Sequence, residues 1–235
     1  MIVSQRPYRN FYGRKKSREL KKQQFSHLDF VLSKFLLNNV DWLDNPDRRE
    51  VDLRRVFDCN DILLEIGFGK GEHLVYQALQ NPKYGFIGVE PYINGVAALA
   101  TKVQQLQVKN IRIYPGDIRD VMDVLPSHSI SRVFLLYPDP WPKKRHHRRR
   151  FVNDEYLHPL ARVMKSKARL HIATDVKDYA RQALEEVPKL GFEWLAENPE
   201  DWRKSWSDWY STRYEQKAIS KGHASIYLSF IRNSK

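Results

Sequence analysis

The sequence predicts an α/β fold built on a doubly wound, mostly parallel sheet. From residue 61 onward, short apolar runs alternate with amphipathic segments, and a glycine-rich turn follows the first run. Apolar strands that alternate with amphipathic helices are typical of parallel sheets with right-handed crossovers. A chain of 235 residues is long enough to form one domain with a sizeable core. We therefore expect a single sheet with helices on both faces.

Of the first five expected strands, each but the third is followed by an expected helix. Strand-like runs fall at 62–66, 86–89, 111–114, 133–137 and 170–173, and a late run at 225–231 predicts a further strand. Helical spacing of apolar residues covers 71–79, 95–107, 151–164 and 176–190. Upstream, 25–37 predicts a helix packed on the main domain, and the charged stretch 44–52 predicts a connector. We expect 1–50 to form a basic N-terminal arm with its packing helix and 51–235 to form the domain.

The net charge of +12 is concentrated in two segments. Residues 6–22 hold eight Lys/Arg and one acid, and residues 143–150 hold six Lys/Arg and no acid. Such runs are often solvated faces or disordered tails, but here two blocks carry the whole excess. The first block also interleaves Tyr8, Phe11 and Tyr12 with its arginines, which suits phosphate neutralisation and stacking on unpaired bases. The pattern favours RNA as the partner.

Other features of the sequence indicate the cellular compartment of the protein. No apolar run approaches the roughly 20 residues that a membrane helix requires, and the start lacks the apolar core of a secretory signal. The single cysteine, Cys59, cannot form an intramolecular disulfide. We expect a cytoplasmic protein without a membrane partner, either a monomer or a homodimer, with an organellar transit peptide as the less favoured interpretation of the basic start.

The glycine turn and the acids around it predict a cofactor site. Glycines at 67, 69 and 71 follow Glu65, and the dinucleotide fingerprint is broken because position 72 is glutamate. An acid beside the turn would repel a pyrophosphate, so the ligand should lack phosphate and carry positive charge, as S-adenosylmethionine does. Glu90 ends the second strand, where a carboxylate can accept from ribose hydroxyls, and Asp117 follows the third, where it can accept from an adenine amino group. A lone acid at such a place is usually a helix cap, but three together favour a site.

The fourth strand leads into Asp139-Pro140-Trp141 and then into the second basic block. Prolines at 138, 140 and 142 bias the preceding residues toward extended conformations and predict a rigid loop. Such a loop would hold Asp139 and Trp141 at fixed positions, as methyl transfer to an aligned nucleophile requires. Lys143 and the residues after it would meet phosphates beside the target.

These residues resemble the bacterial tRNA (guanine-N7)-methyltransferases, from Asp61 to the C-terminus. The resemblance rests on the motifs Glu-Ile-Gly-Phe-Gly-Lys-Gly (65–71), Gly-Val-Glu (88–90), Tyr-Pro-Asp-Pro-Trp-Pro-Lys-Lys-Arg-His-His-Arg-Arg-Arg (137–150), Ala-Thr-Asp (173–175) and Thr-Arg-Tyr-Glu (212–215). The long run at 137–150 is the specific one. The chain departs from the family at Val176, where an aromatic residue is common, and at Tyr210-Ser211, where Arg-Pro is often seen.

The resemblance implies a Rossmann-like class I methyltransferase fold and methylation of guanine-46 in the tRNA variable loop, with S-adenosylmethionine as cofactor. It implies that Asp139 is catalytic, and that the cofactor site comprises Glu65, Gly67, Gly69, Gly71, Glu90, Asp117 and Asp139. The implied substrate contacts are Lys143, Asp175, Thr212, Arg213, Tyr214 and Glu215. The implied RNA contacts are Arg145, His146, His147, Arg148, Arg149 and Arg150.

Two other functions stay open from the residues alone. One is methylation of an exocyclic amine of RNA or DNA, because Asp-Pro-Trp resembles the Asp-Pro-Pro-Tyr type of motif. The other is a non-catalytic RNA-binding module that keeps the fold. We expect no metal, because adjacent histidines in a basic run extend an RNA surface more readily than they form a ligand set. Trp202, Trp206 and Trp209 recur at helical spacing, which favours a packing surface that supports 212–215.

Overall fold

A computed structural model of the chain describes residues 9–17 and 19–234. Arg6, Tyr8 and Arg18 of the predicted basic arm lie outside the described residues. Residues 9–17 are described and contain no helix or strand. The division of the chain at residue 50 stays a prediction, although Leu28 and Val31 of the upstream helix share one hydrophobic core with the main sheet.

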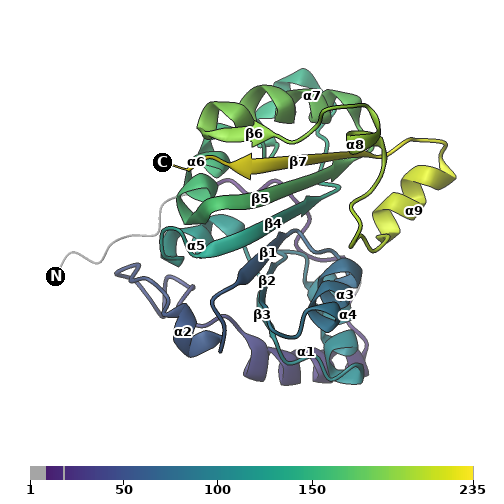
Figure 1. Cartoon of the computed structure of the whole chain (residues 1–235). Coiled ribbons are helices and arrows are strands. Elements are labelled where there is room, and N and C mark those ends of the chain that lie inside the picture. The colour runs from purple at the N-terminus through teal and green to yellow at the C-terminus, as the bar shows by residue number, and fades with distance from the viewer. Residues whose placement is uncertain (1–8, 18, 235) are drawn as a thin grey trace.

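A seven-stranded sheet forms the centre of the molecule, in the order β3-β2-β1-β4-β5-β7-β6 (Figure 1). Its strands are β1 (Ile62–Ile66), β2 (Gly85–Val89), β3 (Ile111–Tyr114), β4 (Ile130–Leu136), β5 (Met164–Thr174), β6 (Phe192–Trp194) and β7 (Ile226–Arg232). The first five run parallel, and β7 lies antiparallel between β5 and β6. The predicted doubly wound, mostly parallel sheet is confirmed, including the late strand.

Helices cover both faces of this sheet. They are α1 (Lys22–Phe35), α2 (Leu53–Val56), α3 (Glu72–Gln80), α4 (Ile93–Gln105), α5 (Ile118–Val124), α6 (Asp154–Val163), α7 (Lys177–Glu186), α8 (Glu200–Arg203) and α9 (Arg213–Ser220), with 3-10 turns η1 (Lys144–Arg149) and η2 (Val187–Leu190). Residues of α1, α3 and α4 pack on one face, and those of α5, α6 and α7 on the other. Parallel strands buried on both faces are nearly continuous apolar runs, as in β2 and, apart from Glu65, in β1.

The upstream helix α1 packs on α4, as the spacing of its apolar residues predicts. Leu28 and Val31 are buried there, and the His27 Nδ1 atom lies 3.2 Å from the Thr101 hydroxyl oxygen. Directly after the helix, the Leu37 N–H donates to the Ile113 carbonyl of β3 at 2.9 Å. Helix α1 therefore packs as one of the helices that cover the sheet.

Three predicted segments differ from the structure. The segment 151–164 becomes helical only at Asp154, and 176–190 splits into α7 and η2, where Pro188 lacks the N–H that a continuing α-helix needs. The tryptophans at 202, 206 and 209 do not share a helix, because α8 ends at Arg203. Their predicted packing role still holds for Trp206 and Trp209, whose ring centroids lie 5.3 Å apart.

Candidate active site

The carboxyl ends of the parallel strands bring the predicted cofactor residues to one edge of the sheet. Ile66 is in register with Val89 of β2 and with Leu135 of β4, and Val89 is in register with Tyr114 of β3. The residues that follow these positions therefore emerge side by side. In an open parallel sheet this edge, outside the strand tips, is where ligands bind.

The glycine turn at 67–71 has a left-handed backbone at all three glycines. The φ angles are +71° at Gly67, +58° at Gly69 and +73° at Gly71. Residues other than glycine adopt such angles only at a cost in free energy. A Cβ at Gly71 would lie 2.4 Å from a methyl carbon of Leu99, so this glycine also lets α3 and α4 approach each other closely. The turn needs glycine for backbone geometry and for packing.

Glu90 ties this turn to the end of β2. Its Oε2 accepts the Gly69 N–H at 2.7 Å and its Oε1 accepts the Tyr92 N–H at 2.9 Å. The side chain is buried, and this burial, reinforced by the nearby carboxylates of Asp139 and Glu65, raises the pKa of Glu90 to about 7. Because a carboxylate already takes the Gly69 amide, the turn is not arranged to bind a phosphate.

Glu65, at the end of β1, is paired with a histidine that the sequence interpretation missed. Its Oε2 lies 2.7 Å from His73 Nδ1, and both side chains are almost fully buried. His73 stands on the first turn of α3, eight residues downstream of Glu65. Nothing in the sequence pattern of one helix marks this residue, because the contact depends on how α3 folds back over β1.

Asp117 sits at the end of β3 and caps α5. Its Oδ1 accepts the Arg119 N–H at 2.9 Å, and both of its oxygens accept from the Arg119 Nε at 3.1 Å. Arg119 is buried and also pairs with Glu155 of α6. Asp117 therefore acts as a helix cap in the structure, and the sequence interpretation did not predict its contact with Arg119.

The loop after β4 is held in an unusual backbone conformation. Tyr137 and Trp141 have φ angles of +48° and +43°. The prolines that follow them predict extended backbone at both positions, and this prediction is wrong, because the tertiary structure imposes the left-handed region. Asp139 lies between them, open to solvent on one side, while partial burial of its carboxyl group raises its pKa. A loop under this kind of strain keeps a fixed shape only where its surroundings enforce it.

The basic block folds as η1 on the outside of this loop. Lys143, Arg145 and Arg148 are exposed, and His146 and His147 are half-buried. Arg149 stacks its guanidinium on two rings, 4.3 Å from the Tyr12 centroid and 4.9 Å from the Trp141 centroid. Trp141 therefore stands between the acidic edge and the cationic block.

Arg150, the last residue of the block, points into the protein. Its side chain is 1% exposed. It donates to the Pro140 carbonyl at 2.7 Å, to Gln182 Oε1 at 2.8 Å and to Asp178 Oδ2 at 2.8 Å. The charge pattern predicts an RNA contact for Arg150, but the structure uses its guanidinium to brace the Asp139 loop from inside. A run of like charges in the sequence does not reveal which member turns inward.

The described part of the N-terminal arm crosses the same edge of the sheet. Arg9 pairs with Asp120 at 3.1 Å and with Asp123 at 2.7 Å, both on α5. Further along the arm, the Lys15 carbonyl accepts the Ile93 N–H of α4 at 2.9 Å. Residues 9–17 thus run from α5 to α4, past the ends of β3, β4 and β2.

The residues implied as substrate contacts lie around this edge. Asp175 follows β5 and has its Oδ2 2.9 Å from His223 Nδ1. Thr212 caps α9 by accepting the Glu215 N–H at 3.2 Å. Arg213 and Tyr214 are exposed on the first turn of α9, which lies beyond the ends of the strands (Figure 1).

Two further contacts fix α9 over the site. A Cβ at Gly69 would lie 3.1 Å from a ring carbon of Tyr214, so Tyr214 stands directly over the glycine turn. Glu215 is buried, and its Oε2 accepts the Trp209 Nε1–H at 2.9 Å while its Oε1 accepts from the Tyr227 hydroxyl. The predicted support of 212–215 by the tryptophan segment is therefore confirmed for Trp209.

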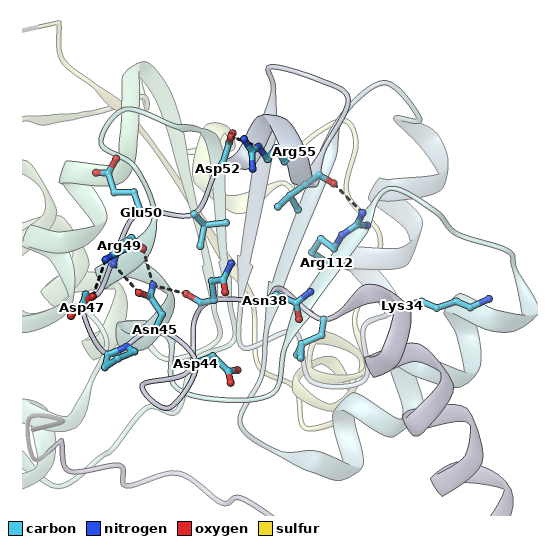
Figure 2. A pocket seen from close by; sticks show the side chains of 15 residues that line it. Lys34, Asn38, Asp44, Asn45, Asp47, Arg49, Glu50, Asp52, Arg55 and Arg112 are labelled. Carbon is cyan, nitrogen blue, oxygen red and sulfur yellow. Dashed lines mark hydrogen bonds and ion pairs between the residues drawn. The ribbon is translucent and has the colours of Figure 1, made fainter. Parts of the chain in front are cut away.

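Two cavities on the described surface lie away from the glycine turn. The larger, of about 710 Å³, lies between the connector and β3, where Asn45, Arg55 and Arg112 are among the lining residues (Figure 2). It is lined by none of the predicted site residues. The smaller, of about 400 Å³, lies beside η1 and is lined in part by His147, Arg148 and Arg150. Among residues 9–17 and 19–234 there is no cluster of three His, Cys, Asp or Glu side chains suited to a metal, and no helix that could span a membrane.

Comparison with known proteins places this arrangement in a family. Residues 59–228 match a family model described as a putative methyltransferase. A tRNA (guanine-N(7)-)-methyltransferase of Ruegeria pomeroyi is 59% identical over 97% of this chain and 96% of its own length. The corresponding protein of Roseobacter denitrificans is 57% identical over 99% of this chain and 100% of its own length.

Among solved structures, a variant of the 16S rRNA (adenine(1408)-N(1))-methyltransferase from Catenulisporales acidiphilia, solved with cosubstrate SAM, superposes with a TM-score of 0.53. It is 17% identical over 75% of this chain and 87% of its own length, which shows a shared fold. The family itself is shown by the identity to the full-length relatives and by the matching model. The chain belongs to the tRNA (guanine-N(7)-)-methyltransferase family.

Proposed function

We propose that this chain transfers the methyl group of S-adenosylmethionine to N7 of guanine-46 in the variable loop of tRNA, and that it does so in the cytoplasm. Membership of the family makes it a methyltransferase. The observation that carries the proposal is the convergence of Glu65, Glu90, Asp117 and Asp139 at one edge of the sheet, beside a cationic block. The family and this chemistry support the same reaction.

The donor set suits S-adenosylmethionine. This cofactor carries a positive sulfonium and an amino group, has no phosphate, and ends in a ribose and an adenine. Glu90 would accept from the ribose hydroxyls and Asp117 from the adenine amino group, while Glu65 and Asp139 would face the cationic part. Because the three glycines at 67, 69 and 71 have no side chains, a ligand can approach the backbone of this turn closely.

The reaction needs no strong general base. Guanine N7 presents an in-plane lone pair and no proton, so the bond from N7 to the methyl carbon forms as the bond from sulfur to that carbon breaks. Positive charge moves from sulfur to the purine ring during this step. Asp139 would orient the reactants and offset the charge on the ring, aided by Asp175 and Glu215.

The RNA would lie across η1. N7 sits on the major-groove edge, which an RNA duplex hides in a deep, narrow groove, so an exposed loop base swung out of its stack is the suitable target. We assign phosphate contacts to Lys143, Arg145, Arg148 and the histidines of η1, with Arg149 holding Trp141 beside the base. We assign Arg150 to bracing the loop, and Asp175 with residues 212–215 to contacts with the guanine.

One experiment tests the assignment directly. Purified protein is incubated with radiolabelled S-adenosylmethionine and unmodified tRNA transcripts, and the labelled nucleotide is mapped. Label should appear as 7-methylguanosine at position 46, and changing that guanine to adenine should abolish it. Label in an exocyclic-amine product, or at another position, would instead support methylation of an amine or a different target. Failure to bind the cofactor in calorimetry would favour a non-catalytic RNA-binding module.

A paired substitution tests the RNA surface. Changing Arg148 and Arg149 together to alanine should weaken tRNA binding. It should also reduce the slope of log Kd against log salt by about one to two, because binding releases about one counterion fewer for each phosphate contact that is lost. Filter binding over a range of salt concentrations measures both effects.

The matched control changes the exposed Arg54 and Arg55 of α2 to alanine, which removes the same charge from another surface. Cofactor affinity should be unchanged in both variants. Equal losses of tRNA binding in the two pairs would show that only net charge matters.

A further inference from the structure

A buried histidine links the two halves of the proposed site. His73 Nδ1 lies 2.7 Å from Glu65 Oε2, and its ring is enclosed by aromatic groups, with centroids at 4.6 Å from Phe134 and 5.2 Å from Trp209. The side chain is 1% exposed. A histidine in such a place could merely fill space, so its polar contacts decide what it does.

Those contacts specify one arrangement of the imidazole protons. A carboxylate only accepts hydrogen bonds, so the proton between the two groups belongs to His73 Nδ1. The other ring nitrogen, Nε2, lies 3.5 Å from the Gln77 side-chain nitrogen, which can only donate. His73 therefore donates to Glu65 through Nδ1 and accepts from Gln77 through Nε2.

Gln77 carries the link to the far side of the site. Its amide nitrogen also donates to the Asp208 backbone carbonyl at 2.6 Å. The Asp208 carboxylate is in turn held by Arg132 of β4 at 2.5 and 3.1 Å, so this part of the chain is fixed to the sheet. An amide has two protons, and Gln77 places one toward each neighbour.

The next residue, Trp209, completes the chain of contacts. Its ring packs on His73, and its Nε1–H donates to Glu215 Oε2 at 2.9 Å. Glu215 lies on the first turn of α9, one residue after Tyr214, which stands over the glycine turn. A continuous set of buried contacts therefore runs from the acid at the end of β1 to the helix over the site.

We propose that His73 is a positioning residue: it holds the Glu65 carboxylate in its cofactor-binding orientation and, through Gln77, sets the position of 206–215 over the guanine. The inference rests on the proposed function, because it takes Glu65 as a cofactor contact and α9 as a substrate contact. His73 touches neither reactant. Without the donor of His73, the desolvation of the buried Glu65 carboxylate would no longer be offset by a hydrogen bond. Glu65 would therefore turn away from its present orientation.

The test separates the two contacts of the ring. His73→Phe removes both contacts, and His73→Asn keeps a donor near the position of Nδ1. Gln77→Leu removes the Gln77 bonds to His73 and to the Asp208 carbonyl but leaves the bond from His73 to Glu65 in place. His171→Phe is the matched control, because His171 is equally buried in the same aromatic cluster, stacked at 5.4 Å on Phe134, and bonds to Ser229 instead of Glu65. Thermal unfolding establishes that each variant folds.

Calorimetry with S-adenosylhomocysteine measures the affinity of the cofactor site independently of methyl transfer. His73→Phe should weaken binding about tenfold or more, the loss expected for one hydrogen bond to a charged group. His73→Asn, Gln77→Leu and His171→Phe should stay within about threefold of the wild type, on the same scale. Equal affinities for His73→Phe and His171→Phe would overturn the inference, as would His73→Asn binding as weakly as His73→Phe.

Steady-state kinetics with tRNA as the varied substrate tests the contact through Gln77 to 206–215. Gln77→Leu should lower kcat/KM for tRNA about tenfold while KM for the cofactor stays at the wild-type value. Unchanged tRNA kinetics in Gln77→Leu would overturn the link to 206–215. If wild-type protein binds the cofactor but transfers nothing to tRNA, the proposed function fails while the calorimetric test of His73 keeps its meaning.

Discussion

Asn in place of Asp139 should lower the rate of methyl transfer by about 100-fold or more, while cofactor affinity falls by less than about tenfold. We expect this loss because the carboxylate would offset positive charge that the purine ring gains only as the methyl group is transferred. The amide has nearly the same shape and keeps an oxygen, so binding geometry survives. Single-turnover transfer to tRNA and calorimetry with the cofactor measure the two quantities separately.

The control for this variant is Asp58→Asn, the same chemical change in an exposed loop ahead of β1. It should transfer at the wild-type rate. Parallel losses of rate and cofactor affinity in Asp139→Asn would mean that Asp139 anchors the cofactor and plays no separate part in the transfer step.

Glu90→Gln should abolish a pH dependence of stability that the wild type shows between about pH 4.5 and 7. Burial raises the pKa of Glu90 to about 7 in the folded protein, from the ordinary glutamate value of 4.5. The folded state therefore holds this proton more tightly, and its contribution to stability is complete below pH 4.5 and is lost as pH rises through 7. A shift of this size corresponds to a free energy on the order of 3 kcal/mol. Urea unfolding of both proteins at pH 5 and pH 8 measures it.

The same residue should make cofactor affinity depend on pH. In the proposed site, ionised Glu90 would accept from the ribose hydroxyls, so cofactor binding would favour loss of the Glu90 proton. Affinity of the wild type should rise as pH increases from 6 to 8, and Glu90→Gln should bind more weakly with a flat profile. Calorimetry in buffers of different ionisation enthalpy should detect proton release near pH 6.5 in the wild type. Identical profiles for the two proteins would place the titrating group elsewhere.

Much of the fold can be predicted because the parallel strands are buried on both faces. Ile62–Ile66 is apolar except for Glu65, and Gly85–Val89 has no polar residue, so both runs predict buried strands. The amphipathic segments between the strands then predict helices that pack on the sheet. Shorter elements escaped prediction. Helix α5 is seven residues long, and β6 has three, too few for a period to be recognised. Tertiary packing determined these elements.

The candidate site shows the same limit. The acids at 65, 90 and 117 could be placed at one edge because topology aligns strand ends, whatever the loops do. The contact of His73 with Glu65 could not be predicted, because it joins α3 to β1. The contact of Arg119 with Glu155 could not be predicted either, because it joins α5 to α6. The left-handed backbone of Tyr137 and Trp141 even contradicts the local preference of residues before proline. Local rules fail where the surrounding protein imposes strain.

The antiparallel position of β7 has a consequence for biosynthesis. A ribosome releases β1 to β5 in an order that lets each join a neighbour already made, but β6 emerges before the strand that must separate it from β5. Until β7 arrives, β6 has no hydrogen-bonding partner in the sheet, and the hydroxyl of Tyr227 cannot reach Glu215. The growing polypeptide can thus assemble β1 to β5 during translation, whereas the contact that holds α9 in place forms only after β7 has cleared the exit tunnel.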